Sequence, residues 1–112
     1  MFTTETNNDI LLITLTVDVL DASNNNDFKD QTSEVVKQQP KVLIDMSALT
    51  FIDSSGLGAI LSCLRNCNEN KGKLKLFAIS KTVRTLFELV RMHKVFDIYN
   101  TKEEALASFG AK

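Results

Sequence analysis

The chain has 112 residues, of which 44% are hydrophobic and 24% charged, and its formal net charge is -1. These values are typical of a single globular domain spanning residues 1–112, and they exclude a disordered or fibrous protein. Because the charge is balanced and no apolar run is long enough to span a bilayer, we expect a cytoplasmic protein with no direct nucleic-acid binding and no membrane insertion.

The N-terminal segment is expected to form a β-hairpin. Ile10–Leu15 is a nearly continuous apolar run rich in β-branched residues. The polar Thr6–Asp9 precedes it and separates it from a short first strand at Met1–Glu5. Two such runs joined by a short polar segment are typical of paired antiparallel strands.

A first helix is expected to follow a polar turn. Asp21–Asp27 is rich in residues that favour turns and helix caps, and apolar residues then recur at helical spacing. The helix should begin at about Ser23 or Asn24 and end at Gln38, because Pro40 cannot continue it.

The next segment predicts a buried strand followed by an amphipathic helix. Val42–Met46 is short and apolar, which favours a central strand covered on both faces. Apolar residues at i, i+3, i+4 and i+7 then run from Leu57 to Cys67, and Gly72 is a typical residue for the end of a helix. Cys63 and Cys67 fall on the apolar side of this helix, and we expect them to pack in the core rather than form a disulfide or a zinc site.

The C-terminal part predicts two more strands and two more helices. The strands are expected at Leu74–Ile79 and Phe96–Tyr99. Ser80 is expected to cap a helix in which Val83, Leu86, Phe87 and Val90 share one face, and Thr101–Glu104 is a capping box for the last helix, with Ala105, Leu106 and Phe109 pointing inward. His93, the only histidine, is expected at the surface without a metal role.

Alternating strands and helices of this kind imply an α/β fold, with a mixed sheet of four to five strands and about four helices. The carboxyl ends of parallel strands meet at one edge of a sheet. We therefore expect Asp21 and the segment before Ser54 to lie at the same edge and to form one interaction surface.

The segment Phe51–Gly58 is the strongest candidate for a functional site, because it places two hydroxyls and two glycines where a strand passes into a helix. At the helix cap, Ser54 would lie beside unpaired N–H groups and the positive end of the helix dipole, which suit a phosphoryl group. Gly56 and Gly58 would leave this helix end bare. Ser54 could also be only an N-cap, and Ser55 is the second candidate acceptor if the helix begins one residue later.

These residues carry a family resemblance that covers nearly the whole chain. Asp53–Gly58, the preceding Ile44–Ile52, and the later Leu86–Phe87 and Glu104–Leu106 resemble the STAS domain family, in particular its anti-sigma factor antagonists. The resemblance implies a STAS-like domain with Ser54 as phosphoacceptor. It also implies two partners, an anti-sigma factor with serine kinase activity and a serine phosphatase.

The partner-binding candidates are Asp21, Asp53, Ser54, Ser55, Gly56, Leu57 and Gly58. Asp53 could present Ser54 to a kinase or could only support the cap. Two departures from the family pattern concern the partner surface. Family members often have a glycine between the second strand and the acidic turn, where Thr16–Asp21 forms a bulkier and longer link here. Arg91 stands where a glycine commonly follows the third helix.

Two other function classes remain open. The chain could be a STAS subunit of a signalling scaffold or a lipid-transport complex, in which Ser54 is never modified. A small hydrolase using Ser54 is disfavoured because the sequence offers no general base, and no catalytic residue, metal site or cofactor is expected.

Overall fold

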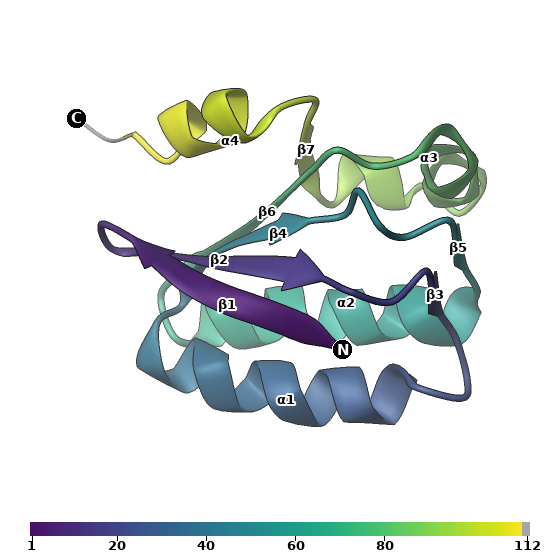
Figure 1. Ribbon diagram of the computed structural model, residues 1–112, viewed down its shortest axis with the longest axis horizontal. Helices are drawn as coiled ribbons and strands as arrows, with labels where there is room; N and C mark the ends of the chain where they lie inside the picture. Colours follow the sequence, from purple (N-terminus) through teal and green to yellow (C-terminus); the bar gives the residue numbers. More distant parts are fainter. Residues whose placement is uncertain (111–112) are drawn as a thin grey trace.

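The computed structural model describes residues 1–110, which contain four α-helices, a five-stranded mixed sheet and a two-stranded parallel sheet (Figure 1). The elements in chain order are β1 (Phe2–Asn7), β2 (Ile10–Leu15), β3 (Val19–Leu20), α1 (Asn25–Gln38), β4 (Lys41–Asp45), β5 (Phe51–Ile52), α2 (Ser54–Glu69), β6 (Lys73–Phe77), α3 (Lys81–Leu89), the 3-10 turn η1 (Met92–Lys94), β7 (Asp97–Tyr99) and α4 (Lys102–Ser108). The predicted α/β class is confirmed. Among the described residues, no helix combines the length and apolar character needed to cross a membrane.

The larger sheet has the strand order β1-β2-β4-β6-β7. β1 pairs antiparallel with β2, and every other neighbouring pair is parallel. β4 lies in the centre, and Val42, Leu43 and Ile44 are fully buried. This confirms the prediction from the apolar run, because a central strand buries side chains on both of its faces.

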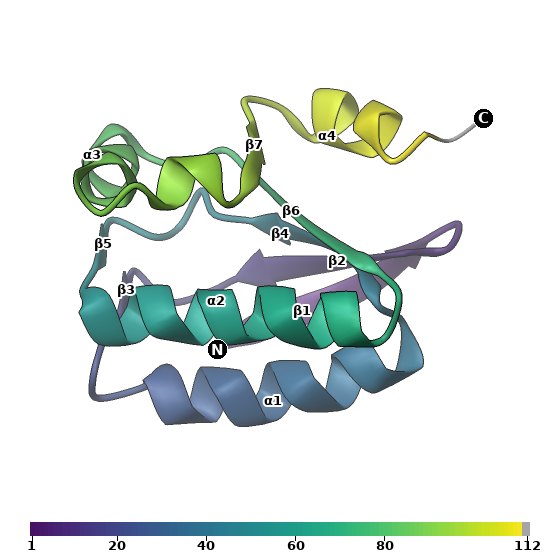
Figure 2. The same cartoon turned by 180° about the vertical axis from the view of Figure 1, so that it is seen from behind.

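The sheet separates two cores. α1 and α2 lie side by side against one face, while α4 lies on the opposite side (Figures 1 and 2). α3 lies near β5, and its Val83 and Phe87 belong to the larger core. The larger core, under α1 and α2, contains alternate strand residues such as Ile13 and Ile44 together with Phe28 of α1. The smaller core lies under α4, where Ala105 packs with Leu43. The helices therefore fix the two faces of β4 from opposite sides.

The N-terminal hairpin is longer than predicted. Thr6 and Asn7 belong to β1 and pair with Leu11 and Ile10, so that the turn consists of Asn8 and Asp9 alone. Asn8 adopts a left-handed conformation with φ of 58°. Asparagine tolerates that conformation better than most residues, which allows the tight two-residue connection.

The third helix is shorter than predicted, because the pattern through Val90 does not continue it. α3 ends at Leu89, Arg91 turns left-handed with φ of 62°, and η1 follows. Val90 is 54% exposed and does not share the buried face of Val83 and Phe87. Arg91 thus takes up the conformation for which glycine is the ordinary residue at a helix end.

Gly72 does not play the role expected of a helix-ending glycine. α2 ends at Glu69, and the left-handed residue after it is Lys71, with φ of 63°. A Cβ atom on Gly72 would lie only 2.1 Å from the carbonyl oxygen of Pro40. Glycine is required here because the start of β6 packs closely against the chain that enters β4.

Lys75 is the buried cation of the smaller core. Its ammonium group donates to the carbonyl and the hydroxyl of Ser108 at 2.9 and 3.0 Å, and lies over the rings of Tyr99 and Phe109. The Asp97 carboxylate is 3.9 Å away. A cation at the last residue of α4 also complements the negative end of the helix dipole. Lys75 therefore attaches α4 to the sheet.

Replacing Lys75 by Ala should lower the free energy of unfolding by about 1–3 kcal/mol, because it leaves the half-buried C-terminal end of α4 without its donor. Lys73 is the matched control, since it is exposed on the same strand. Lys73→Ala should change stability by no more than about 0.5 kcal/mol. Urea unfolding of both variants checks this, and equal effects would show that Lys75 does not hold α4.

Candidate functional site

The candidate site is assembled by the small second sheet, which the sequence analysis did not predict. β3 and β5 pair in parallel, with Val19 opposite Phe51 and Leu20 opposite Ile52. The pair is extended by a hydrogen bond from the Thr50 N–H to the Asp18 carbonyl, at 2.7 Å. As a result, the turn after β3 and the N-terminus of α2 meet at one edge of the molecule (Figure 1). This confirms that Asp21 and the segment before Ser54 lie at one edge, whereas their role as an interaction surface stays a prediction.

Asp53, rather than Ser54 or Ser55, is the N-cap of α2. Its backbone is extended, with φ of -105° and ψ of -174°, and its side chain accepts from the Gly56 N–H at 2.9 Å. The second carboxylate oxygen accepts from the Ala22 N–H at 3.3 Å. A short acidic side chain is a favourable cap because it accepts from the first turn and carries charge opposite to the helix dipole.

Ser54 is the first residue of α2 and is exposed, whereas Ser55 is half-buried. The sequence prediction of a serine cap is therefore off by one residue, because Asp53 supplies the capping oxygen. The Ser54 hydroxyl is left available at the positive end of the helix, where the first backbone N–H groups have no carbonyl partner within the helix.

The two glycines differ, and the prediction that both leave the helix end bare is wrong for Gly56. A Cβ atom there would lie 2.2 Å from the Leu20 carbonyl oxygen and 2.7 Å from an Ile52 carbon, whereas one on Gly58 would have nothing within 4 Å. Gly58 is exposed, and Leu57 is only 6% exposed. Gly56 therefore packs closely against the Leu20 backbone of β3, Leu57 lies in the larger core, and of these three residues only Gly58 is exposed.

Asp21 organises the turn that faces α2. Its carboxylate accepts from the Ser23 hydroxyl at 2.6 Å and the Ser23 N–H at 2.9 Å. The bond from the hydroxyl has the larger effect and the bond from the N–H the smaller one, and together they hold the pKa of Asp21 below its ordinary value of 3.8. Asn24 is the N-cap residue of α1, but its side chain bonds the Asp21 N–H and the Val19 carbonyl instead of the helix.

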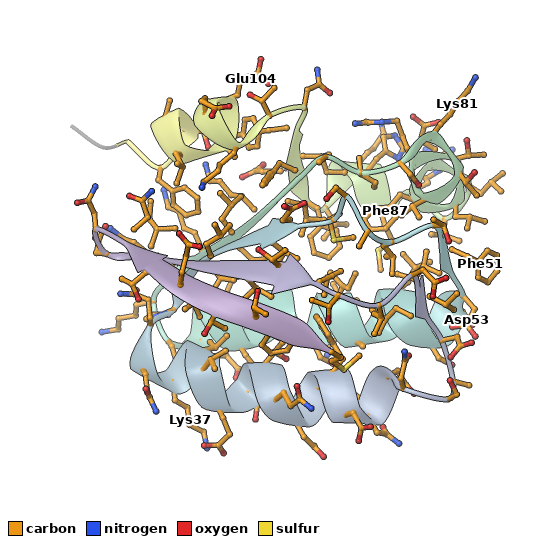
Figure 3. All side chains as sticks on the ribbon, in the orientation of Figure 1. Lys37, Phe51, Asp53, Lys81, Phe87 and Glu104 are labelled. Carbon is orange, nitrogen blue, oxygen red and sulfur yellow. The ribbon has the colours of Figure 1, made fainter. Side chains whose placement is uncertain are left out.

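Phe51 is a surface residue at this edge that the predicted partner-binding residues did not include. It is 46% exposed, while its neighbour Ile52 is 1% exposed, because alternate residues of a strand point to opposite faces. Figure 3 shows Phe51 pointing outward at the end of the molecule that carries Asp53. The short strand gave no alternating pattern long enough to predict this from sequence.

The edge is acidic. The ion pairs found within residues 1–110 are Lys37–Glu34, Lys41–Asp9 and Lys75–Asp97, none of which includes Asp21 or Asp53. Both side chains are half-buried, and Asp53 directly precedes Ser54 in the sequence.

Cys63 and Cys67 lie in the larger core, as their helical spacing predicts. The hydrogen bond with Cys63 and burial raise the pKa of the Cys67 thiol, which keeps this thiol protonated near neutral pH. His93 is half-buried rather than at the surface, and its buried Nδ1 has no hydrogen-bond partner among the described residues.

Comparison with known proteins relates this site to one family. The sequence model of the STAS domain matches residues 1–105, and the chain therefore belongs to the STAS domain family. It is 30% identical to BtrV of Bordetella bronchiseptica, a candidate anti-sigma factor antagonist, over 69% of this chain and 66% of BtrV. It is 28% identical to an anti-sigma-B factor antagonist of Listeria monocytogenes, over 62% of this chain and 60% of that protein. The matched segments thus span less than two thirds of these relatives.

A similar fold is found in SpoIIAA, an anti-sigma factor antagonist. Its unphosphorylated form superposes with a TM-score of 0.82 at 24% identity, covering 100% of this chain and 98% of that one. The phosphorylated form, from Bacillus, gives 0.72 at 24% identity, with coverage of 97% and 99%. At this identity the likeness establishes the shared fold. The relatives' names are those of regulatory binding proteins, in agreement with the prediction that this chain is not an enzyme.

The two glycines give a matched test of the site's construction. Gly56→Ala should lower the free energy of unfolding by about 1–3 kcal/mol, because its methyl group overlaps the Leu20 carbonyl and the backbone must move. Gly58→Ala should raise it by about 0.5–1 kcal/mol, since alanine fits the open space and favours the helix. Thermal unfolding of both variants measures the difference, and a tolerated Gly56→Ala would contradict the close approach of β3.

The lowered pKa of Asp21 predicts a specific pH dependence. A carboxyl group whose pKa is lower in the folded state stabilises the protein fully above its unfolded pKa, and that contribution disappears as the pH falls through the folded pKa. The non-titrating variant Asp21→Asn is the reference. The difference in Tm between wild type and this variant should stay constant from about pH 7 to pH 5. Below about pH 4 the Tm of the wild type should fall relative to that of the variant. A difference that stays constant down to pH 3 would show that the Ser23 bonds do not favour the carboxylate.

Proposed function

We propose that this protein is an anti-sigma factor antagonist whose binding is switched by phosphorylation of Ser54. In its unphosphorylated form it binds an anti-sigma factor with serine kinase activity and so frees a sigma factor. The observation that carries the proposal is the exposed Ser54 hydroxyl at the first position of α2, in the segment Asp53–Gly58. The names of the relatives support the same class of partner.

Phosphorylation at this position is compatible with the fold. A phosphoryl group on Ser54 would lie at the positive end of α2, where a negative charge is favourable by about 0.3–1 kcal/mol at an exposed site. The cap on Gly56 comes from Asp53 and does not use the Ser54 side chain. Modification therefore leaves the cap intact, and the switch acts on binding rather than on folding.

The same phosphoryl group would oppose a docked partner. It adds about -1.5 to -2 charges next to Asp53 and Asp21, which lack cationic partners in residues 1–110. Burying this unmatched group in an interface costs several kcal/mol, and each 1.4 kcal/mol weakens affinity about tenfold. Addition of phosphate by the kinase would thus release the antagonist.

The remaining parts of the cycle follow from the same proposal. A serine phosphatase removes the phosphate and restores binding, and both partners meet the protein in the cytoplasm. The protein contributes a docking surface and an acceptor hydroxyl, without a cofactor or direct contact with nucleic acid. Asp21, Asp53, Ser54, Ser55 and Gly58 are the candidate residues that form or frame this surface.

Incubating the protein with its cognate kinase and ATP tests the switch. We expect one phosphate on Ser54 by mass spectrometry, and none on Ser54→Ala, which should still bind the kinase because Asp53 keeps the helix capped. The phosphorylated protein should bind at least about tenfold more weakly by calorimetry. Ser54→Asp should weaken binding in the same direction, although it carries less charge than a phosphate.

Ser55→Ala is the matched control, because it removes the neighbouring hydroxyl and leaves Ser54 in place. It should accept phosphate and bind as the wild type does. Phosphate found on Ser55, or equal affinity of the modified and unmodified proteins, would contradict the proposal. A wild type that is never phosphorylated would favour the scaffold function instead.

A further inference from the structure

The turn between β3 and α1 satisfies nearly all of its own backbone N–H groups. The Asp21 N–H donates to the Asn24 side chain, and the Ser23 N–H to the Asp21 side chain, both at 2.9 Å. The N–H groups of Asn24 and Asn25 donate to the Asp21 carbonyl at 3.2 and 2.9 Å. Only Ala22 donates to a residue outside the turn.

That outside acceptor is the carboxylate of Asp53, 31 residues away in the sequence. Each of its two oxygens accepts one hydrogen bond: Oδ1 accepts from the Gly56 N–H at 2.9 Å, and Oδ2 accepts from the Ala22 N–H at 3.3 Å. A helix cap needs one acceptor oxygen, and serine or asparagine supplies it as well as aspartate does. The second oxygen is needed only for the turn.

Asp53 links the turn to the acceptor serine, because it bonds Ala22 and directly precedes Ser54. Ala22 and Ser23 are exposed, and Ser54 is exposed and follows Asp53 directly. A partner that covers Ser54 therefore meets the Ala22–Ser23 segment in the position that Asp53 gives it. A segment held in its bound conformation before docking loses less conformational entropy on binding.

We infer that Asp53 is a positioning residue: its carboxylate caps α2 with one oxygen and holds the Asp21–Asn24 turn with the other, so that turn and Ser54 form one rigid docking surface. Asp53 acts through Ala22 and need not touch the partner. This inference rests on the proposed function only for the identity of the partner. The hold on the turn is a property of the free protein.

Two variants separate the cap from the hold on the turn. In Asp53→Ser the single hydroxyl oxygen can accept from Gly56 but cannot also accept from Ala22. In Asp53→Asn the amide oxygen can cap the helix, while the amide NH2 group is a donor and cannot accept from Ala22. Both should keep the wild-type Tm to within a few degrees, because the three residue types are comparable N-caps.

Amide hydrogen exchange measured by NMR tests the hold on the turn directly. In both variants the Ala22 amide should exchange faster than in the wild type, while the Gly56 amide keeps its protection. Asp18→Asn is the control for loss of a carboxylate at this edge, because its exposed side chain makes no hydrogen bond within the described residues. It should leave both amides unchanged. Unaltered Ala22 exchange in the two Asp53 variants would overturn the inference.

Phosphorylation kinetics test the consequence for docking. When the protein is the kinase substrate, loss of the bond between Ala22 and Asp53 should raise KM about three- to tenfold, which corresponds to the free energy of one hydrogen bond. The kcat should change less than about twofold. A purely structural defect would not separate KM from kcat in this way. Faster Ala22 exchange with an unchanged KM would overturn the link to docking. If the kinase does not modify the wild type, the proposed function fails, and the Ala22 exchange rate still decides whether Asp53 holds the turn.

Discussion

The site depends on the close approach of the Leu20 carbonyl to the first turn of α2. The Asp53 N–H donates to that carbonyl at 3.3 Å, and Gly56 faces it with no room for a Cβ atom, which would lie 2.2 Å away. Strands of two residues, such as β3 and β5, are too short to be stable alone. Their pairing persists because this contact joins β3 to a long helix that is anchored in the core.

This arrangement separates the part of α2 that is modified from the part that stabilises it. Ala59, Ile60 and Cys63 are buried in the core, whereas Ser54 lies outside it at the helix end. A charge added at Ser54 would therefore lie at the positive end of the helix dipole and outside the buried core. Such a site is suited to changing which partners bind while the fold stays the same.

Local patterns in the sequence predicted those elements whose stability is local. The apolar repeat from Leu57 to Cys67 and the capping box at Thr101 gave α2 and α4, since each depends on residues three or four apart. Left-handed residues escaped prediction. Lys71, Ala78 and Arg91 have φ values of 63°, 60° and 62°, and none is a glycine or asparagine. Ala78 and Arg91 follow the ends of β6 and α3, which come earlier than the apolar pattern predicts, and Lys71 takes the left-handed position after α2 that Gly72 was expected to take. The surrounding packing overrides the local preference at these positions.

The sequence by itself determined the α/β class, the central strand β4 and the serine at the start of α2, because burial periodicity and capping are encoded within a few neighbouring residues. Only the tertiary structure decided that Asp53 is the cap, that Gly56 is buried while Gly58 is open, and that Ala22 lies against Asp53. Those features depend on pairing between β3 and β5, whose residues are about 30 positions apart. Contacts over such separations arise from the packing of whole elements, and no short pattern specifies them.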